Sequence, residues 1–228
     1  MPYVQGEKML ITVRFSKQEN GTFVAHTDIL RALNRTFRRA GIIMNYSAGF
    51  NKHMLLNLTQ PLPLGIASEC EYVTADVASE MSAEEFLNKF NACCPPFLHG
   101  ERAWITEKKP ALASVITASR FFFRSPEAIA VKEKLENCRN DYSITYVHGG
   151  KEKTVDAAKL IYDLSVTEEG IEAVIASGNV NLRSDALGKN WNDDFGLHIG
   201  LVDIVRKEQY IASPTGFVSA TEYMETLL

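Results

Sequence analysis

Hydrophobic and polar positions alternate along several short stretches of the chain, and a period of two is typical of half-buried β-strands. The first such stretch, LITVRF, covers residues 10–15 and is built around β-branched residues. Further strands are predicted at residues 42–46, 55–58, 69–77, 98–106, 113–124, 142–147, 161–166, 171–176 and 197–206. The pattern therefore predicts a protein rich in short strands.

A helical pattern interrupts the strands early in the chain. Apolar residues recur at four-residue steps from Ile29 to Phe37, which is the spacing of one face of an amphipathic helix. Thr27 or Asp28 is predicted to cap the start of this helix, and Gly41 to end it in a left-handed conformation. The opposite face of the helix is then left for polar side chains.

Further helices are predicted from capping signals. They are expected to begin at Ser82 with a capping box to Glu85, at Ser125-Pro126, at Ser184, and at Ser219 with a capping box to Glu222. Each half of the chain then has the order β-α-β-β-α-β, so we predict an α+β fold of two ferredoxin-like modules packed together. The segment KKPAL at residues 108–112 is the predicted boundary, which gives modules over residues 1–107 and 108–228.

The charge distribution points to one segment. The whole chain has a formal charge of -4, yet residues 29–68 contain no Asp or Glu. The cations of this segment are Arg31, Arg35, Arg38, Arg39 and Lys52. A solvated charged face is the plain interpretation. However, the helix has no acid after Asp28, so its arginines repel one another unless an anion binds there. Arginine also suits bidentate phosphate contacts.

The turn that follows adds polar candidates. Ser47, Gly49, Asn51 and His53 lie in a glycine-containing loop, and Gly49 is predicted to have a positive φ. His26 and His53 are candidates for a general acid or base, although a lone histidine is more often structural. Three aromatic residues, Tyr46, Phe50 and Phe123, could stack on unpaired bases, but burial in a core is the more common fate of such rings.

Several functional classes have no support in the sequence. The four cysteines, Cys70, Cys93, Cys94 and Cys138, form no CxxC pair, and we expect no metal or other cofactor. No P-loop, GxGxxG or GxSxG motif is present. No apolar run approaches the ~18 residues of a membrane span, and the N-terminus lacks a signal-like pattern, so a cytoplasmic location is expected.

The sequence resembles the bacterial radical SAM-linked protein family. The matching residues are VRFSK (13–17), His26, Asp28, RRAG (38–41), the segment 46–53, PLPLG (61–65), Glu69, Glu71, KTVD (153–156), LRSDAL (182–187) and VRKEQY (205–210). This resemblance implies a domain of unknown function that is found beside, or fused to, radical S-adenosylmethionine proteins. The chain has no CxxxCxxC cluster motif, so it is expected to be the partner of a radical SAM protein encoded nearby.

Three functions remain open at this point. The first is a non-catalytic accessory module that binds RNA, with tRNA as one candidate, through the basic helix face. Its predicted binding residues are Arg31, Arg35, Arg38, Arg39, Ser47, Gly49, Asn51 and His53. The second is an RNA-processing or nucleotide-modifying enzyme that uses His26 or His53. The third is a protein-interaction subunit that docks a radical SAM enzyme.

Overall fold

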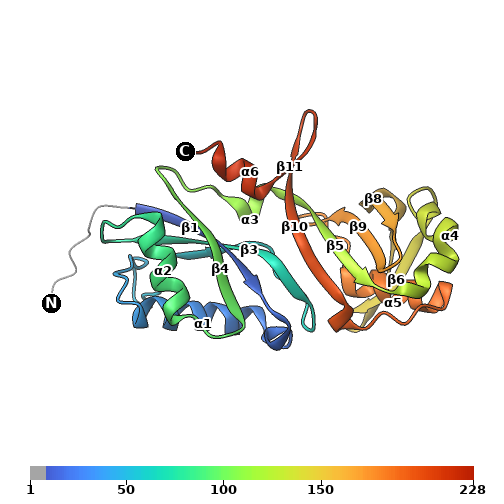
Figure 1. Ribbon diagram of the computed structural model, residues 1–228, viewed down its shortest axis with the longest axis horizontal. Helices are drawn as coiled ribbons and strands as arrows, with labels where there is room; N and C mark the ends of the chain where they lie inside the picture. Colours follow the sequence, from blue (N-terminus) through green and yellow to red (C-terminus); the bar gives the residue numbers. More distant parts are fainter. Residues whose placement is uncertain (1–8) are drawn as a thin grey trace.

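The strands with alternating polar and apolar residues pair into one large mixed sheet (Figure 1). A computed structural model describes residues 9–228. The prediction that the N-terminus lacks a signal-like pattern concerns residues 1–10, of which residues 1–8 lie outside the described part. The order of the sheet is β4-β1-β3-β10-β5-β9-β8, with β2 added to β3 and β11 added to β10. Six α-helices accompany it in the described residues. The protein therefore has a mixed α/β fold.

In the first half of the chain, β1 lies between two antiparallel neighbours, β3 and β4, and β2 pairs with the far side of β3. The elements are β1 (Met9–Lys17), α1 (His26–Arg39), β2 (Leu56–Leu58), β3 (Ala67–Val77), α2 (Ala83–Cys93) and β4 (Leu98–Thr106). Alternate residues of β1, Ile11, Val13 and Phe15, are fully buried in a core with residues of α1 and α2. The period of two in this strand therefore decides which face the helices cover.

In the second half, β5 lies between β10 and β9, and β8 pairs with β9, all antiparallel. The elements are α3 (Leu112–Val115), β5 (Ile116–Arg124), α4 (Lys132–Asn137), β6 (Ser143–His148), β7 (Lys151–Asp156), β8 (Ile161–Val166), β9 (Gly170–Ala176), α5 (Ser184–Phe195), β10 (Ile204–Ser213), β11 (Gly216–Ser219) and α6 (Ala220–Glu225). Strands β6 and β7 form a separate hairpin. Phe123 of β5 packs edge-on against Trp191 of α5 in the core of this half.

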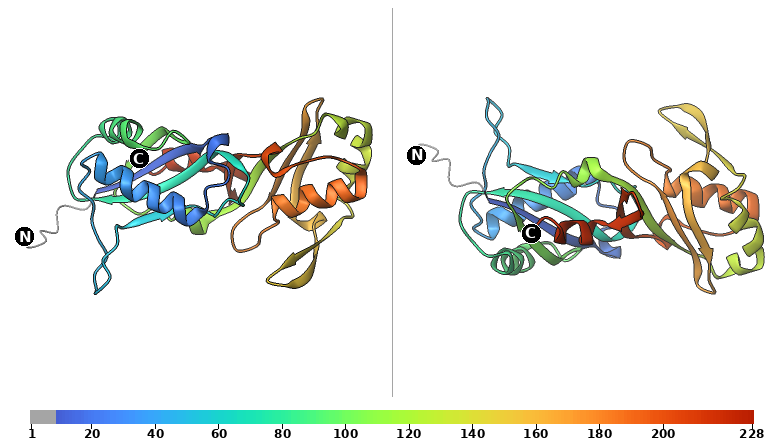
Figure 2. Two further views of the ribbon diagram at one scale, coloured as in Figure 1. Left: turned by 90° about the horizontal axis from the view of Figure 1, so that it is seen from below. Right: turned by 90° about the horizontal axis from the view of Figure 1, so that it is seen from above.

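The two halves meet where β10 pairs in parallel with the start of β3, with Val205 opposite Ala67 and Arg206 opposite Ser68. Helices α1 and α5 lie on one side of the sheet, and α3 and α6 lie on the other (Figures 1 and 2). The sequence predicted one sheet for each half, and this is wrong because the backbone pairing continues across the junction. The division into two ferredoxin-like modules at residues 108–112 stays a prediction.

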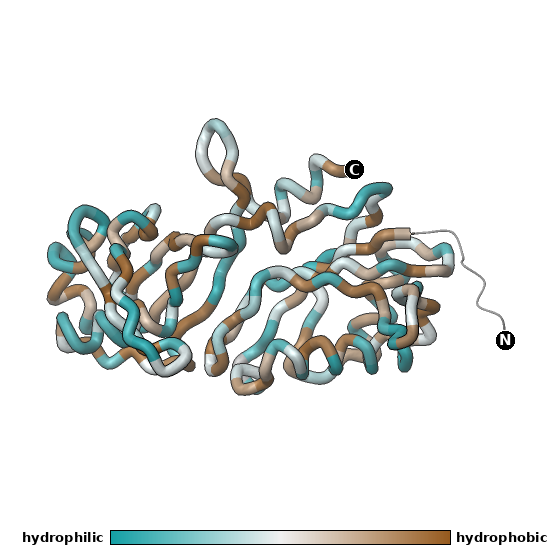
Figure 3. The backbone as a smooth tube through the Cα atoms, turned by 180° about the vertical axis from the view of Figure 1, so that it is seen from behind, coloured by the Kyte–Doolittle hydropathy of each residue, from teal (hydrophilic) through white to brown (hydrophobic). Residues whose placement is uncertain are grey.

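Most of the predicted helices and strands are present. Figure 3 shows how hydrophobic and hydrophilic residues follow one another along the backbone. The strand expected at residues 42–46 is wrong, because only isolated bridges form there, Met44 with Val77 and Tyr46 with Met54. The strand expected at residues 197–206 begins instead at Ile204. Leu197 and Ile199 precede this strand and are both buried, so the sequence alternates there as it does in a strand. They pack against the core but do not pair with a strand of the sheet.

The capping predictions have mixed outcomes. Ser82 accepts a hydrogen bond from the amide of Glu85, and Ser219 forms a reciprocal capping box, so both of these caps are confirmed. The prediction for α1 is wrong, since the helix begins at His26 and the preceding Ala25 has no side-chain cap. Ser125 makes no cap bond either, because Pro126 opens a 3-10 turn before α4.

Candidate nucleic-acid interface

Helix α1 presents its arginines from a well-anchored position. Its inner face carries Ile29, Leu33 and Phe37, all nearly or fully buried. The Phe37 ring lies 5.5 Å from that of Phe86 and 6.0 Å from that of Phe90, centroid to centroid, which fixes α1 against α2. Because the apolar face is held in this way, the opposite face is turned to solvent in a defined orientation.

The four predicted arginines are all exposed, and their surroundings differ. Arg31 forms an ion pair with Asp28 at 2.7 Å, and Arg39 donates to the carbonyl of Cys93 at 2.6 Å. Arg35 and Arg38 make no side-chain hydrogen bond or ion pair within residues 9–228. The first two acids that follow α1 in the sequence also pair elsewhere, Glu69 with Lys207 and Glu71 with Arg206. The face therefore carries unneutralised positive charge at Arg35 and Arg38.

The loop after α1 is a closed turn held by its own side chains. The amide of Ser47 donates to the carbonyl of His53 at 2.9 Å, and the amide of His53 donates to the Ser47 hydroxyl at 3.1 Å. The Ser47 hydroxyl lies 2.9 Å from His53 Nδ1, and the carbonyl oxygen of Asn51 lies 3.4 Å from the same ring nitrogen. The φ of Gly49 is 111°, which confirms the predicted positive value. Bonds among the loop residues thus shape the turn.

The predicted groove shared by the arginines and the loop is not built by direct contacts. In the described part of the chain, Ser47, Asn51 and His53 make no hydrogen bond to Arg31, Arg35, Arg38 or Arg39. The loop follows the end of α1 and projects away from the sheet (Figure 2). The arginine face and the loop are therefore two separate surfaces that follow each other along the chain, and they do not form one preformed pocket.

The two candidate histidines lie at opposite ends of α1. His26 is its first residue and is half-buried, whereas His53 belongs to the exposed loop after the helix. Burial lowers the pKa of His26; the carboxylate of Glu71 opposes this change, and the charge of Arg206 adds to it. A helix of this length spans about 20 Å, and within residues 9–228 the two histidines share no hydrogen bond.

A buried ionic cluster lies at the junction of the two halves, and the sequence analysis missed it. Arg206 and Glu71 form an ion pair at 2.9 Å, with side-chain exposures of 3% and 7%. Arg206 also donates to the carbonyls of Gln60 and Pro61. Lys17 is 1% exposed, and its ammonium group donates to the Thr22 carbonyl at 3.0 Å. Burial lowers the pKa of Lys17, and Glu71 opposes this effect.

A signal for this cluster was present in the sequence. Lys17 continues the two-residue phase of Val13 and Phe15, so its side chain had to face the core side of β1. Arg206 likewise keeps the phase of the buried Ile204. A charged residue in the buried phase of a strand requires a buried partner.

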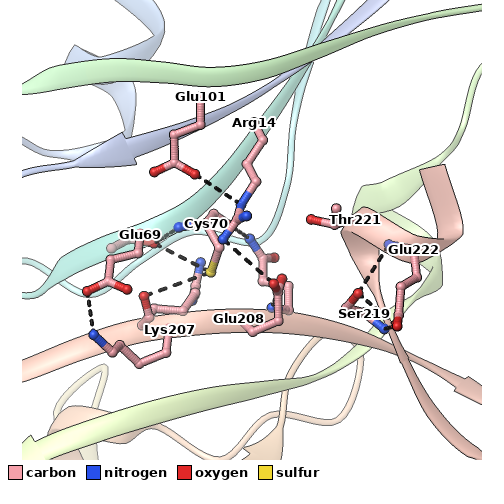
Figure 4. Close-up of polar contacts among 12 residues, drawn as sticks. Arg14, Glu69, Cys70, Glu101, Lys207, Glu208, Ser219, Thr221 and Glu222 are labelled. Carbon is pink, nitrogen blue, oxygen red and sulfur yellow. Dashed lines mark hydrogen bonds and ion pairs between the residues drawn. The ribbon is translucent and has the colours of Figure 1, made fainter. Parts of the chain in front are cut away.

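The other face of the sheet holds a second polar network, shown in Figure 4. Arg14 lies between Glu101 at 3.5 Å and Glu208 at 3.7 Å. The hydroxyl of Tyr72 lies 2.9 Å from that of Thr221, which ties α6 to β3. Cys70 is fully buried beside this network, and burial raises the pKa of its thiol well above the usual value. A buried neutral thiol is inert, so Cys70 is not a candidate nucleophile.

Two further observations concern the described part of the chain. None of its His, Cys, Asp and Glu side chains gather in groups of three or more that could hold a metal ion. Across residues 9–228, the helices are all too short or too polar to cross a membrane.

The fold and the surface define a mixed α/β protein with an exposed arginine face on one helix. Residues 11–184 match the model of a family described as "Uncharacterized protein conserved in bacteria (DUF2344)". The chain belongs to this family. No curated protein matches the chain.

Proposed function

We propose that this protein is an accessory module that binds RNA, tRNA being one candidate, through the exposed face of α1. The observation that carries the proposal is the pair Arg35 and Arg38, exposed and without a partner in the described residues, on a helix whose one acid is Asp28. Arginine side chains on a rigid helix favour phosphate binding, because the guanidinium group donates two parallel hydrogen bonds to the same anion.

The strand order supports the finer proposal of two ferredoxin-like modules joined edge to edge. In the first half the order is β4-β1-β3-β2, and in the second it is β10-β5-β9-β8, each with antiparallel neighbours. Modules of this kind are frequent among RNA-binding domains, which is support by analogy. The link to a radical SAM protein encoded nearby rests on the sequence resemblance, and in this proposal the chain delivers RNA to that partner.

A salt titration of RNA binding tests the proposal. The variant Arg35→Gln/Arg38→Gln removes two charges and keeps helix propensity nearly unchanged. We expect its affinity to fall across all RNA sequences, and the slope of log K against log salt to become shallower by about 1.4, since each lost contact to a single strand contributes ~0.7.

A matched control separates this surface from net charge. Arg124→Gln/Lys134→Gln removes two exposed cations from the other half of the protein. This control is expected to bind RNA with the affinity and salt slope of the wild type. Equal slopes for the wild type and the Arg35→Gln/Arg38→Gln variant would refute the proposal.

An RNA-processing or nucleotide-modifying enzyme is the second candidate, and the environment of His26 favours it. A half-buried imidazole with a lowered pKa, beside Glu71, is neutral at pH 7 and can accept a proton. His53 lacks such surroundings because its ring bonds within an exposed loop. If the protein turns over RNA, His26→Gln should abolish turnover and leave binding intact. Turnover that persists in His26→Gln would exclude this role.

A further inference from the structure

Phe50 lies at the tip of the loop that follows α1, and its side chain is fully in water. Its relative exposure is 104%, whereas the next most exposed large apolar residue in the described chain, Leu228, reaches 76%. The other two predicted stacking residues differ from it, since Phe123 is fully buried and Tyr46 is half-buried. Among the three, Phe50 alone offers an open ring face.

The tip is held in place from its base. Met54 is 5% exposed, packs in the core of the first half, and forms a bridge with Tyr46. Two backbone-involving hydrogen bonds between Ser47 and His53 close the turn above this bridge. The positive φ of Gly49 then turns the chain so that the next residue, Phe50, occupies the tip. An anchored turn presents the ring at a lower cost in ordering than a free loop would.

The charge near this ring matches a polyanion. No Asp or Glu occurs between Asp28 and Glu69, and the segment carries Arg35 and Arg38 before the loop and Lys52 within it. Figure 2 shows the loop leaving the body of the protein beside the end of α1. An RNA strand that lies on the arginine face and continues past the end of α1 reaches the loop that carries Phe50.

We propose that Phe50 stacks on an unpaired base of the RNA that binds α1, so that the protein selects single-stranded or looped RNA over duplex. This inference rests on the proposed function and adds the class of RNA. A phenyl ring can stack on any base with an open face, whereas bases inside a duplex already stack on their neighbours.

The test measures binding to a single-stranded RNA and to a perfect RNA duplex of the same length, by fluorescence anisotropy. Phe50→Ala is expected to bind the single strand about 5- to 150-fold more weakly, the range given by losing one stacked base. Its duplex binding should be unchanged. Phe50→Trp should restore single-strand binding, with quenching of the new indole fluorescence on stacking. The fold should tolerate both changes, because the ring is fully exposed.

Phe23→Ala is the matched control, since Phe23 is also an exposed phenylalanine, at 69%, but precedes α1. It should bind both RNAs as the wild type does. Equal loss of single-strand and duplex binding in Phe50→Ala, or no loss, overturns the stacking role. Phe50-dependent binding to phosphatidylserine vesicles, with no RNA preference, overturns it as well. If wild type binds neither RNA, the proposed function fails and the stacking role with it.

Discussion

Replacing Glu71 with Gln removes the one carboxylate that pairs with Arg206 within residues 9–228, while keeping nearly the same side-chain volume. A guanidinium nitrogen of Arg206 lies 2.9 Å from a carboxylate oxygen of Glu71, and both side chains are almost inaccessible to water. Lys17 is buried close enough for the charge of Glu71 to affect its pKa. The substitution therefore leaves two buried cations without their counter-charge. Breaking a buried ion pair by removing one partner typically costs 3–5 kcal/mol.

Other contacts of Arg206 set the expected value within that range. Its guanidinium group keeps hydrogen bonds to the carbonyls of Gln60 and Pro61, and it lies 5.5 Å from the centroid of the Phe121 ring. These contacts partly stabilise the lone cation, so we expect a loss of about 3 kcal/mol, the lower end for buried pairs. In urea this corresponds to a midpoint lower by about 1–3 M, for a slope of 1–3 kcal/mol/M.

The neighbouring ion pair supplies a matched control. Glu69 and Lys207 lie on the same two strands, with side-chain exposures of 51% and 37%. Exposed pairs contribute about 0–1 kcal/mol, so Glu69→Gln should change the urea midpoint little. Trp104 of β4 and Trp191 of α5 report on the two halves, and Trp→Phe variants allow each to be followed alone. Equal midpoints for Glu71→Gln and Glu69→Gln would refute the assigned role of the buried pair.

Two further predictions concern His26 and Gly49. Because the pKa of His26 is lowered from 6.5 in the folded protein, the unfolded chain binds more protons in the pH range from about 6.5 down to the lower pKa of the folded state. Stability should therefore fall as pH drops below about 6.5, and His26→Gln should reduce this slope in urea titrations at pH 7.5 and 5.5; an unchanged slope would contradict it. Gly49→Val should cost about 1–3 kcal/mol through backbone strain alone, since no atom lies within 4 Å of the added Cβ. A valine tolerated without loss in thermal unfolding would show that the turn relaxes freely.

The sequence predicted local elements well where a periodic pattern and a boundary signal coincide. Strand β4 was predicted at residues 98–106 and is found at Leu98–Thr106, because its buried positions and the preceding Pro95-Pro96 define both its phase and its start. Phe121 and Phe123 face the core and Phe122 the other side, as the alternation requires. Where apolar residues pack without pairing, as at Leu197 and Ile199, the same pattern gave a false strand.

The junction could not be predicted from local patterns. The pairing of β10 with β3 joins residues far apart in sequence, and neither strand carries a local mark of its neighbour. The same holds for the Arg206–Glu71 pair, whose residues lie 135 positions apart. For the candidate interface, the sequence located the arginines and the glycine turn, but not which cations have partners. That distinction depends on rotamers and on carbonyls such as that of Cys93.

The two ends of α1 differ in a way that places the proposed interface. At its start, Asp28 neutralises Arg31, and the carboxylate of Glu71 acts on His26. At its end, the last turn carries Arg38 and Arg39, and a helix C-terminus stabilises cations through its dipole. The chain then enters the loop with Phe50 at its tip. The positive charge of Arg38 and Arg39 therefore lies at the C-terminal end of α1, and the exposed ring lies in the loop that leaves from this end. Under the proposed function, RNA contacts this end and its loop, and the start of the helix serves the junction.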